Sequence, residues 1–291
     1  MQRPIRKGVL LAGGHGSRLF PLTVSVNKHL LPVHDKPMVF YPLSTLMLAG
    51  LRDLLIVSTP AHVPAFEQLL GDGDRFGVRI AYATQPSARG VADGLLAAEP
   101  FLDGEGCALA LGDNLFWGYL DFLRAALARS EGATAFAYPV QDASGYGIVE
   151  LDDAGRPVGI EEKPSHPRSQ LAVPGLYVLD GEAVSFARAA QKSPRGELEI
   201  ADVLRAYLQK GRLRVARLGR GMAWLDMGTP EGLLGASEFV ATIQRRQGLY
   251  VGCLEEVALH MGWRTRDQLR TVLAAWPAGP YRAYVEALLH E

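Results

Sequence analysis

The chain has 291 residues, and its 30 Lys and Arg nearly balance its 31 Asp and Glu, which leaves a formal net charge of −1. Hydrophobic residues make up 48% of the sequence and charged residues 21%, a composition that excludes disorder as the main state. The near-zero charge gives no global field that would attract nucleic acid or an anionic membrane, although it does not exclude a local anion site.

Cysteine content and hydropathy exclude further classes of protein. Cys107 and Cys253 are too few for a disulfide-stapled secreted scaffold, and neither belongs to a CxxC or Cys/His zinc spacing. Glycines soon interrupt the apolar run that follows the basic start, which is not typical of a signal peptide. The longest charge-free apolar stretch, residues 37–51, is too short to span a bilayer. We therefore expect a cytoplasmic protein with no membrane or nucleic-acid partner.

The first half of the chain alternates short apolar runs with helical patterns. The predicted strands cover residues 8–12, 54–58, 78–83 and 107–111. The predicted helices cover residues 37–49, 91–98 and 119–129, and a further short helix ends at Gly71. Continuous apolar strands between helices are typical of a parallel sheet covered on both faces, which binds ligands at the carboxyl ends of its strands.

The second half of the chain has a different pattern of predicted elements. Residues 146–151 and 157–162 flank a turn signal and predict a β-hairpin. Thr229 and Pro230 predict the start of a helix that runs to about Gln247. The remaining predicted elements are strands at 171–179 and 213–218 and helices at 197–208, 254–261, 266–275 and 281–290.

A glycine-rich loop follows the first predicted strand. Gly13, Gly14 and Gly16 allow sharp turns and bring backbone N–H groups close to an anion, and Arg18 can bind phosphate oxygens with two hydrogen bonds. The loop lacks the Gly-Lys-Ser/Thr end of a P-loop, and Leu19 stands where a dinucleotide-binding loop has its third glycine. The alternative is a plain glycine-rich turn.

Charged residues recur where the predicted strands end. Lys28 would add a second phosphate-binding cation, with a surface lysine as the alternative. Asp113 ends the fourth strand, and Asp226 lies just before the helix that begins at Pro230, so each could also be a cap or a turn residue. Mg²⁺ usually binds one or two carboxylates together with substrate phosphates, and these two acids could hold one ion.

Two loops carry further candidates. Gln85 follows the third strand, and its amide could read a base edge because it both donates and accepts hydrogen bonds; the alternative is a plain loop residue. Glu162 and Lys163 close the hairpin, where a solvated charge run is the default. The seven histidines show no metal-binding pattern, and His15 is expected to have no role. Together these features favour direct phosphoryl or nucleotidyl transfer without a protein nucleophile.

The sequence resembles the glucose-1-phosphate thymidylyltransferases, which are short sugar-nucleotide pyrophosphorylases. The matching motifs include LAGGHGSRL at 11–19, LGDN at 111–114, EEKP at 161–164 and GRGMAWLD at 219–226, with others at 35–38, 41–50, 70–73, 196–200 and 246–249. The resemblance implies that dTTP and α-D-glucose 1-phosphate give dTDP-glucose and pyrophosphate by Mg²⁺-dependent, in-line displacement at the α-phosphorus. It also implies a homotetramer with an inhibitory nucleotide site near a subunit contact.

The resemblance assigns roles residue by residue. The catalytic cations would be Arg18, Lys28 and Lys163. The nucleotide would contact Leu11, Gly13, Gly14, Gly16, Ser17, Gln85, Gly90 and Asp113. The sugar would contact Tyr146, Gly147, Glu162, Lys163 and Val173. Mg²⁺ would be held by Asp113 and Asp226.

The expected fold is a doubly wound, Rossmann-like α/β mixed sheet of the glycosyltransferase-A-like kind, with an inserted β-hairpin sugar lobe and C-terminal helices. We expect a catalytic domain over residues 1–240, with a nucleotide half at about 1–140 and a sugar-binding part at about 141–228. Residues 241–291 would form a helical segment for oligomer contacts or regulation.

Several residues depart from the family pattern. His29 stands where the family usually has Gln, Asp93 where it has an amide, and Pro174 where it has Thr. Two alternatives therefore stay open: the same chemistry with UTP or another hexose 1-phosphate, and a non-catalytic regulatory homologue. We also expect weakened end-product inhibition, because Ser, Pro and Arg of many family members are replaced here by Gly252, Leu254 and His260.

Overall fold

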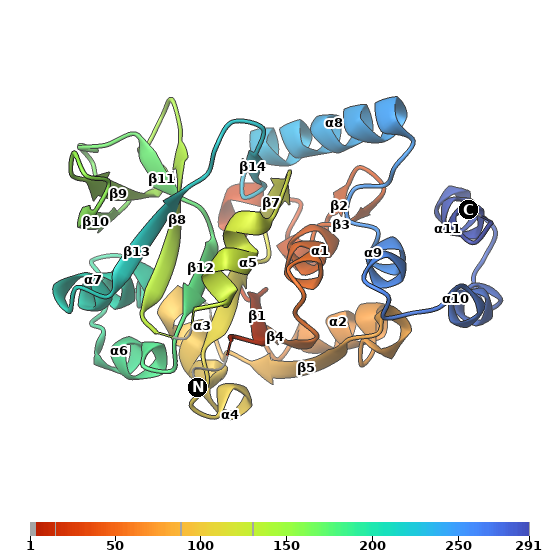
Figure 1. The fold of residues 1–291 in the computed structure, drawn as a ribbon, viewed down its shortest axis with the longest axis horizontal. Coiled ribbons are helices and arrows are strands. Elements are labelled where there is room, and N and C mark those ends of the chain that lie inside the picture. The colour runs from red at the N-terminus through yellow and green to blue at the C-terminus, as the bar shows by residue number, and fades with distance from the viewer. Residues whose placement is uncertain (1–3, 15, 88, 130, 291) are drawn as a thin grey trace.

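The computed structural model describes residues 4–14, 16–87, 89–129 and 131–290, so the expectation for His15 falls outside the described residues. Its largest feature is a ten-stranded sheet that mixes parallel and antiparallel strands. Helices cover both faces of this sheet (Figure 1), as the alternating sequence predicts. The predicted α/β class with a mixed sheet is confirmed.

Four parallel strands form one half of the sheet. They are β1 (Lys7–Leu11), β4 (Asp53–Ser58), β5 (Arg79–Thr84) and β6 (Cys107–Leu111). Their bounds agree with the predicted strands to within a residue or so, because β1, β4 and β6 are short apolar runs that are mostly buried, whereas β5 at the sheet edge is only partly buried. The parallel arrangement brings all four carboxyl ends to one edge of the sheet, where the glycine loop and Asp113 follow.

The other half of the sheet is mainly antiparallel. It contains β12 (Leu176–Leu179), β8 (Ala133–Pro139), β11 (Leu171–Val173), β9 (Gly147–Leu151), β10 (Pro157–Glu162) and β13 (Leu213–Arg217). The strand order across the whole sheet is β10-β9-β11-β8-β12-β6-β1-β4-β5, and β13 pairs with β8. The predicted hairpin is confirmed, since β9 and β10 pair with Gly147 opposite Glu162.

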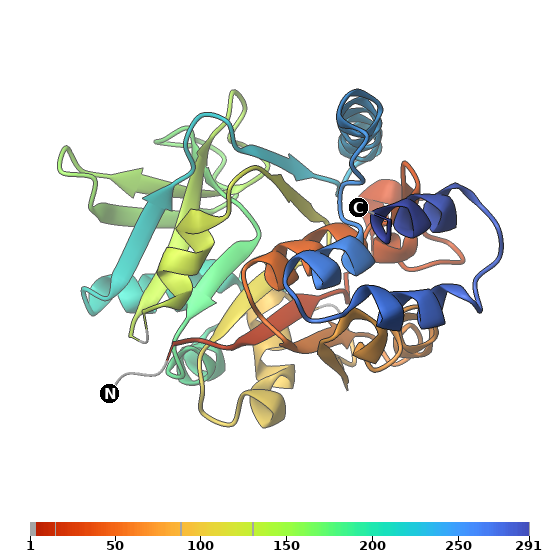
Figure 2. The same cartoon turned by 45° about the vertical axis from the view of Figure 1, so that its right-hand side comes forward.

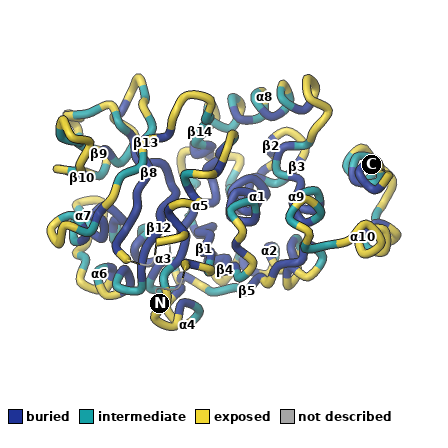
Figure 3. Tube along the Cα trace, in the orientation of Figure 1, coloured by how far each residue is buried: buried dark blue, intermediate teal, exposed yellow. Residues whose placement is uncertain are grey.

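Successive residues of the central strands point to opposite faces and contribute to two cores. Leu10 and Ile56 pack on one side, and Val9 and Leu55 pack on the other. The first core is covered by α1 (Phe40–Leu48), α2 (Val63–Leu70) and α5 (Asp121–Leu127), and the second by α3 (Val91–Ala97), α4 (Glu99–Leu102), α6 (Ala183–Ala189) and α7 (Ile200–Gln209). Figure 3 shows the central strands buried, whereas β10 at the sheet edge carries exposed residues.

Three predicted elements need correction. The helix predicted at 37–49 begins only at Phe40, because Pro37 belongs to β3 (Lys36–Pro37), which pairs with β2 (Pro32–Val33). The strand predicted at 171–179 is two strands, since the backbone at Pro174 and Gly175 leaves the ladder. The helix predicted at 197–208 begins at Ile200, because the Glu199 backbone is extended.

A second, small sheet joins distant parts of the chain. It pairs β7 (Asn114–Trp117) with β14 (Ala223–Asp226) in antiparallel register. The helix that follows, α8 (Pro230–Gln247), has the predicted start and end, and the Thr229 hydroxyl accepts the predicted capping bond from the Gly232 N–H at 3.1 Å. Within the described ranges, no helix combines the length and apolar character that crossing a bilayer requires.

The chain ends in α9 (Leu254–His260), α10 (Arg266–Leu273) and α11 (Pro280–Leu288); α9 packs against α1, and α10 and α11 lie outside it, as Figure 2 shows in blue. The buried Lys36 of the β2–β3 hairpin contacts the end of α8 and aromatic residues of this C-terminal segment. The Lys36 Nζ lies 2.6 Å from Asp35 Oδ1 and 3.2 Å from Gln244 Oε1. It also lies 4.8 Å from the ring centroid of Tyr250 and 5.7 Å from that of Tyr281, within cation–π range.

Candidate active site

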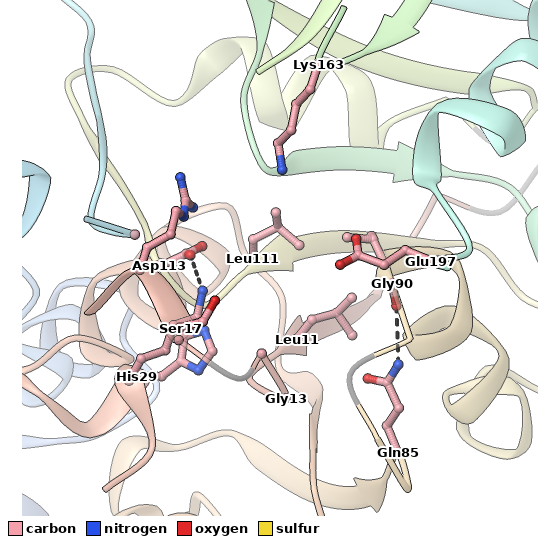
Figure 4. Close-up of a pocket in the computed structure, with 16 residues that line it drawn as sticks. Leu11, Gly13, Ser17, His29, Gln85, Gly90, Leu111, Asp113, Lys163 and Glu197 are labelled. Carbon is pink, nitrogen blue, oxygen red and sulfur yellow. Dashed lines mark hydrogen bonds and ion pairs between the residues drawn. The ribbon is translucent and has the colours of Figure 1, made fainter. Parts of the chain in front are cut away.

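Two adjoining cavities open at the carboxyl ends of the parallel strands. The glycine-loop cavity, of about 300 Å³, is bordered by the loop after β1, by Lys28 and by Gln85. The hairpin cavity, of about 140 Å³, lies between the β9–β10 hairpin, the segment before α7 and β14. Arg18, Asp113 and Lys163 border both cavities. In Figure 4, Lys163 reaches into the site from the side opposite to Gly13 and His29.

The structure gathers the predicted site residues in the expected groups. The glycine-loop cavity is lined by every predicted nucleotide contact, namely Leu11, Gly13, Gly14, Gly16, Ser17, Gln85, Gly90 and Asp113. The hairpin cavity is lined by every predicted sugar contact, namely Tyr146, Gly147, Glu162, Lys163 and Val173. Asp226 borders the hairpin cavity as well. The roles of these residues stay predictions, but their proximity is a property of the fold.

Close packing explains the glycines of the loop. A Cβ on Gly14 would lie 3.1 Å from Lys28 Cε, and a Cβ on Gly13 would lie 3.2 Å from Gln85 Oε1. Gly16 has a positive φ of 63°, which favours glycine. The carbonyl before the loop, that of Ala12, accepts hydrogen bonds from Ser58 Oγ at 2.8 Å and Asn27 Nδ2 at 2.9 Å. These contacts hold the loop backbone beside the cavity.

An ion pair between Lys28 and Asp113 crosses the site. Lys28 begins a single 3₁₀ turn, which Asn27 caps by accepting a hydrogen bond from the His29 N–H at 2.9 Å. The Lys28 ammonium donates to Asp113 Oδ2, and Asn114 Nδ2 donates to Asp113 Oδ1 at 3.0 Å. Burial acts to raise the pKa of the Asp113 carboxyl, but the charge of Lys28 and the hydrogen bonds from Lys28 and Asn114, acting with the other neighbouring charge, together outweigh it and hold that pKa well below its ordinary value.

Pairing of β7 with β14 brings the second carboxylate to the first. Asp226 lies opposite Asn114 in the ladder, and the Met227 N–H donates to the Asp113 carbonyl at 2.8 Å. Burial and the nearby Asp113 charge raise the pKa of the Asp226 carboxyl. The buried Asp113 and the half-buried Asp226 carry two negative charges, of which Lys28 pairs with one, so a further cation could be accommodated beside them.

This donor set fits a hard divalent cation. Carboxylate oxygens are the ligands that Mg²⁺ prefers, and one or two of them suffice where substrate phosphates complete the shell. No cluster of three or more His, Cys, Asp or Glu side chains that could hold a metal occurs among the described residues. The Asp113 and Asp226 pair thus has the chemistry of a site shared with a phosphate ligand.

Arg18 supplies a cation that no described carboxylate neutralises by an ion pair. Its side chain is exposed, and its guanidinium packs against Gly228, where a Cβ would lie 2.5 Å from Arg18 Nη2. Gly228 also donates its N–H to Asp226 Oδ1 at 2.9 Å. The backbone at Gly228 therefore sets the relative positions of the guanidinium and the second carboxylate.

The structure shows how a histidine is accommodated at position 29, where the family usually has Gln. The ring is 2% exposed, and its Nδ1 lies 2.8 Å from Asn27 Oδ1. Burial, followed by the Lys28 charge, lowers the pKa of His29 to about 3, so the ring is neutral near pH 7. It packs beside Gly112, where a Cβ would lie 2.5 Å from the ring Cδ2. His29 thus lines the cavity without adding a charge to it.

Gln85 has a fixed position beneath the cavity. Its Nε2 donates to the Gly90 carbonyl at 3.2 Å and to Asp93 Oδ2 at 2.7 Å. Gly90 has a positive φ of 108°, and a Cβ there would lie 2.3 Å from the Leu198 carbonyl oxygen. A larger residue at Gly90 would separate the Gln85 loop from the segment before α7.

The hairpin cavity contains residues without a predicted individual role. Arg195 Nη2 lies 2.9 Å from Glu199 Oε1 and 3.4 Å from Glu162 Oε1. Burial raises the pKa of the Glu162 carboxyl, while the charges of Lys163 and Arg195 oppose that effect. Glu197 borders both cavities. Only the family motif at 196–200 marked this stretch in the sequence, because its charges alone suggest an ordinary exposed turn.

Trp224 was also not singled out from the sequence by itself. Its indole Nε1 donates to Asn114 Oδ1 at 2.6 Å, and its ring meets Tyr146 edge-on with centroids 5.0 Å apart. Asn114 Oδ1 accepts a further bond from the Gly175 N–H at 2.9 Å. The backbone break between β11 and β12 is therefore hydrogen-bonded through Gly175 to Asn114, which lies next to Asp113 in the site.

A third cavity, of about 710 Å³, lies away from this site and is lined by Gly252 and Arg220 among others. Of the other C-terminal residues that depart from the family pattern, Leu254 is buried in the core and His260 is exposed on α9. Weakened end-product inhibition stays a prediction.

The fold and the paired cavities define the class of this protein. The chain matches the family model described as nucleotidyl transferase over residues 7–243. A UDP-glucose pyrophosphorylase crystallised with UDP-glucose shares the fold, with a TM-score of 0.73 at 23% identity over 82% of this chain and 99% of that chain. The chain is a nucleotidyltransferase, as its sequence predicts.

Closer relatives identify the family within this class. A glucose-1-phosphate thymidylyltransferase of Xanthomonas campestris pv. campestris is 51% identical over 285 residues, which cover 97% of each chain. Another, of Mycolicibacterium smegmatis, is 49% identical over 97% of this chain and 99% of that relative. A crystal structure described as a glucose-1-phosphate thymidylyltransferase of Bacillus anthracis superposes with a TM-score of 0.75 at 35% identity, covering 80% of this chain and 94% of that one. The chain belongs to the glucose-1-phosphate thymidylyltransferases.

Proposed function

We propose that the protein transfers dTMP from dTTP to α-D-glucose 1-phosphate and releases pyrophosphate. The observation that carries this proposal is the shared wall of Arg18, Asp113 and Lys163 between the two cavities. A nucleotide in the glycine-loop cavity and a sugar phosphate in the hairpin cavity would meet at this wall. Their reacting phosphates would therefore lie close to the cations Arg18 and Lys163 and to the Asp113 carboxylate.

Positioning and charge neutralisation supply the catalysis in this scheme. The sugar phosphate oxygen attacks the α-phosphorus in line, and pyrophosphate leaves from the opposite side. Lys163 binds the attacking sugar phosphate, and Arg18 binds the α-phosphoryl group and the leaving pyrophosphate. Lys28, which pairs with Asp113 in the free protein, bridges the two phosphates when substrates bind. No protein nucleophile or covalent intermediate takes part.

We further propose that Asp113 and Asp226 hold Mg²⁺. The bound ion would neutralise negative charge on the triphosphate as the bond to pyrophosphate breaks. Gly228 and Asn114 keep the two carboxylates oriented through hydrogen bonds of 2.9 and 3.0 Å. Residues 1–240 would contain all of these catalytic residues. We also propose that the protein is a cytoplasmic homotetramer in which residues 241–291 form subunit contacts. Light scattering of the purified chain measures this oligomeric state.

The test is pyrophosphate release in Mg²⁺ from each of dTTP, UTP, CTP, GTP and ATP with glucose 1-phosphate. We expect the fastest release with dTTP and slower release with UTP, because one methyl group is worth only roughly 1–3 kcal/mol in a pocket. Preference for another nucleotide would contradict the proposed substrate. Absence of release with all five, and with other hexose 1-phosphates, would favour the non-catalytic alternative.

A further inference from the structure

A buried acid stands behind the amide of Gln85. Asp93 lies in the first turn of α3 and is 5% exposed, and Gln85 is 4% exposed. Asp93 Oδ2 accepts the hydrogen bond from Gln85 Nε2 at 2.7 Å, and Asp93 Oδ1 pairs with Arg89 Nη2 at 2.8 Å. Asp93 does not line either site cavity, so it acts on a ligand only through Gln85.

The chemistry of a carboxylate settles which way the amide points. An ionised carboxylate only accepts hydrogen bonds, so Asp93 must face the NH₂ group of Gln85 and never its oxygen. The second hydrogen of that NH₂ group goes to the Gly90 carbonyl. Both amide donors are thereby used within the protein. The remaining polar atom, Gln85 Oε1, lies on the Gly13 side of the cavity floor (Figure 4).

We propose that Asp93 is a specificity-determining positioning residue, which locks Gln85 so that it offers the nucleotide base an acceptor and no donor. A base with a ring N–H at this edge, such as the imide of thymine or uracil, would donate to Gln85 Oε1. Cytosine presents a lone pair at the same ring nitrogen and would meet acceptor against acceptor. The inference rests on the proposed function, because it assumes that the base lies over Gln85.

The test compares dissociation constants of dTTP and dCTP, measured by calorimetry for the unmodified chain and for Asp93→Asn. An asparagine amide can donate to Gln85 Oε1, which frees the glutamine to turn its NH₂ group toward the cavity. We expect the preference for dTTP over dCTP to fall at least tenfold, since mispaired polar groups are a major source of discrimination. The same fall should appear in the ratio of kcat/KM values with glucose 1-phosphate.

Asp121→Asn is the matched control, because Asp121 also lies in the first turn of a helix. Its side chain is 82% exposed and pairs only with Arg124 among the described residues. We expect this variant to keep the nucleotide preference of the unmodified chain.

A second variant separates positioning from a general loss of structure. Gln85→Met removes the amide, so in that background Asp93→Asn should leave the dTTP to dCTP ratio unchanged. An equal fall in both backgrounds, or an unchanged ratio in the single Asp93→Asn variant, would overturn the proposal. Because the binding ratio needs no turnover, a chain that selects dTTP but transfers nothing would contradict the proposed function and support this inference.

Discussion

Several charged side chains at the site, although not Arg18, are paired with other described residues before any substrate arrives. Lys28 neutralises Asp113, and Arg195 is held by Glu199 and Glu162. An incoming triphosphate would therefore exchange partners with these groups instead of meeting bare charges. Such exchange limits the desolvation cost of a buried charge, which is severe when the charge is unpaired.

Asp113→Asn tests the carboxylate that both cavities share. The amide would lose the ion pair with Lys28 and would bind Mg²⁺ weakly, so we expect Mg²⁺-dependent pyrophosphate release to fall on the order of 100-fold or more. Asp121→Asn, on the exposed side of α5, should retain full activity. Near-normal release from Asp113→Asn would remove this carboxylate from the mechanism.

His29 predicts a pH dependence of folding stability. The folded protein keeps the ring neutral because its pKa is lowered to about 3, whereas the unfolded chain binds a proton below about pH 6.5. The free energy of unfolding should therefore drop by about 2 kcal/mol between pH 7.5 and pH 5 through this group alone. Urea titrations at the two pH values should show that His29→Gln lacks this part of the loss. An identical pH dependence in the variant would contradict the assignment.

At the level of elements, the start of α8 combines stability with site geometry. Gly232 packs so closely on Asp226 that a Cβ would lie 2.2 Å from the Asp226 carbonyl oxygen. The Thr229 hydroxyl caps the helix by accepting from the Gly232 N–H. The cap therefore fixes the helix end against which Asp226 is held.

Thr229→Ala should lower the free energy of unfolding by about 1 kcal/mol, the usual worth of an N-cap hydroxyl. Thr229→Ser keeps the oxygen and should remain close to the unmodified chain. Chemical denaturation of the three proteins measures the difference. Equal destabilisation by Ala and Ser would show that the methyl group, and not the hydrogen bond, matters at Thr229.

The sequence predicted elements well where local chemistry decides them. Apolar runs for the parallel strands and the Thr229-Pro230 start of α8 are visible within a few residues. β8 was not predicted, because Ala133, Ala135 and Ala137 hide its alternation among helix-forming residues. Tertiary contacts also moved the start of α1, since Pro37 pairs in a hairpin that no local pattern shows.

The candidate site was predictable as a set of residues but not as an arrangement. Spacing alone could not show that Asp113 and Asp226 meet, because their proximity depends on β7 pairing with β14 across about a hundred residues of chain. Family motifs supplied that grouping. The bonds of Gln85 to Asp93 and of Trp224 to Asn114 depend on side-chain directions, and no sequence pattern encodes those.

At the scale of the whole molecule, Lys36 links the catalytic part to the C-terminal helices. Burial lowers the pKa of this lysine, but Asp35 opposes the effect through its hydrogen bond and charge. Gln244 extends the connection, since its Oε1 also accepts from the Val251 N–H at 3.0 Å. One ammonium group thus joins the β2–β3 hairpin, the end of α8 and the rings of the final segment.

Lys36→Met should loosen that connection while keeping a similar side-chain length. Loss of the cation–π contacts and of a charged hydrogen bond is worth about 1–2 kcal/mol, so amide exchange in α9 and α11 should become about tenfold faster. Exchange in α6 should not change. Lys210→Met, at an exposed lysine, serves as the control. Unchanged exchange in α9 and α11 would show that other contacts hold the segment.

The indole of Trp224 lines the hairpin cavity and can report on its occupancy by fluorescence. The chain has four tryptophans, and among them only Trp224 borders either site cavity. In the proposed assignment glucose 1-phosphate would fill the hairpin cavity and replace water beside this ring, so intrinsic emission should change in intensity and wavelength. The response should disappear in Trp224→Phe and should stay small when a nucleoside monophosphate alone fills the other cavity. If emission responds in this way, Trp224 would be an intrinsic fluorophore that reports binding of the sugar phosphate separately from binding of the nucleotide.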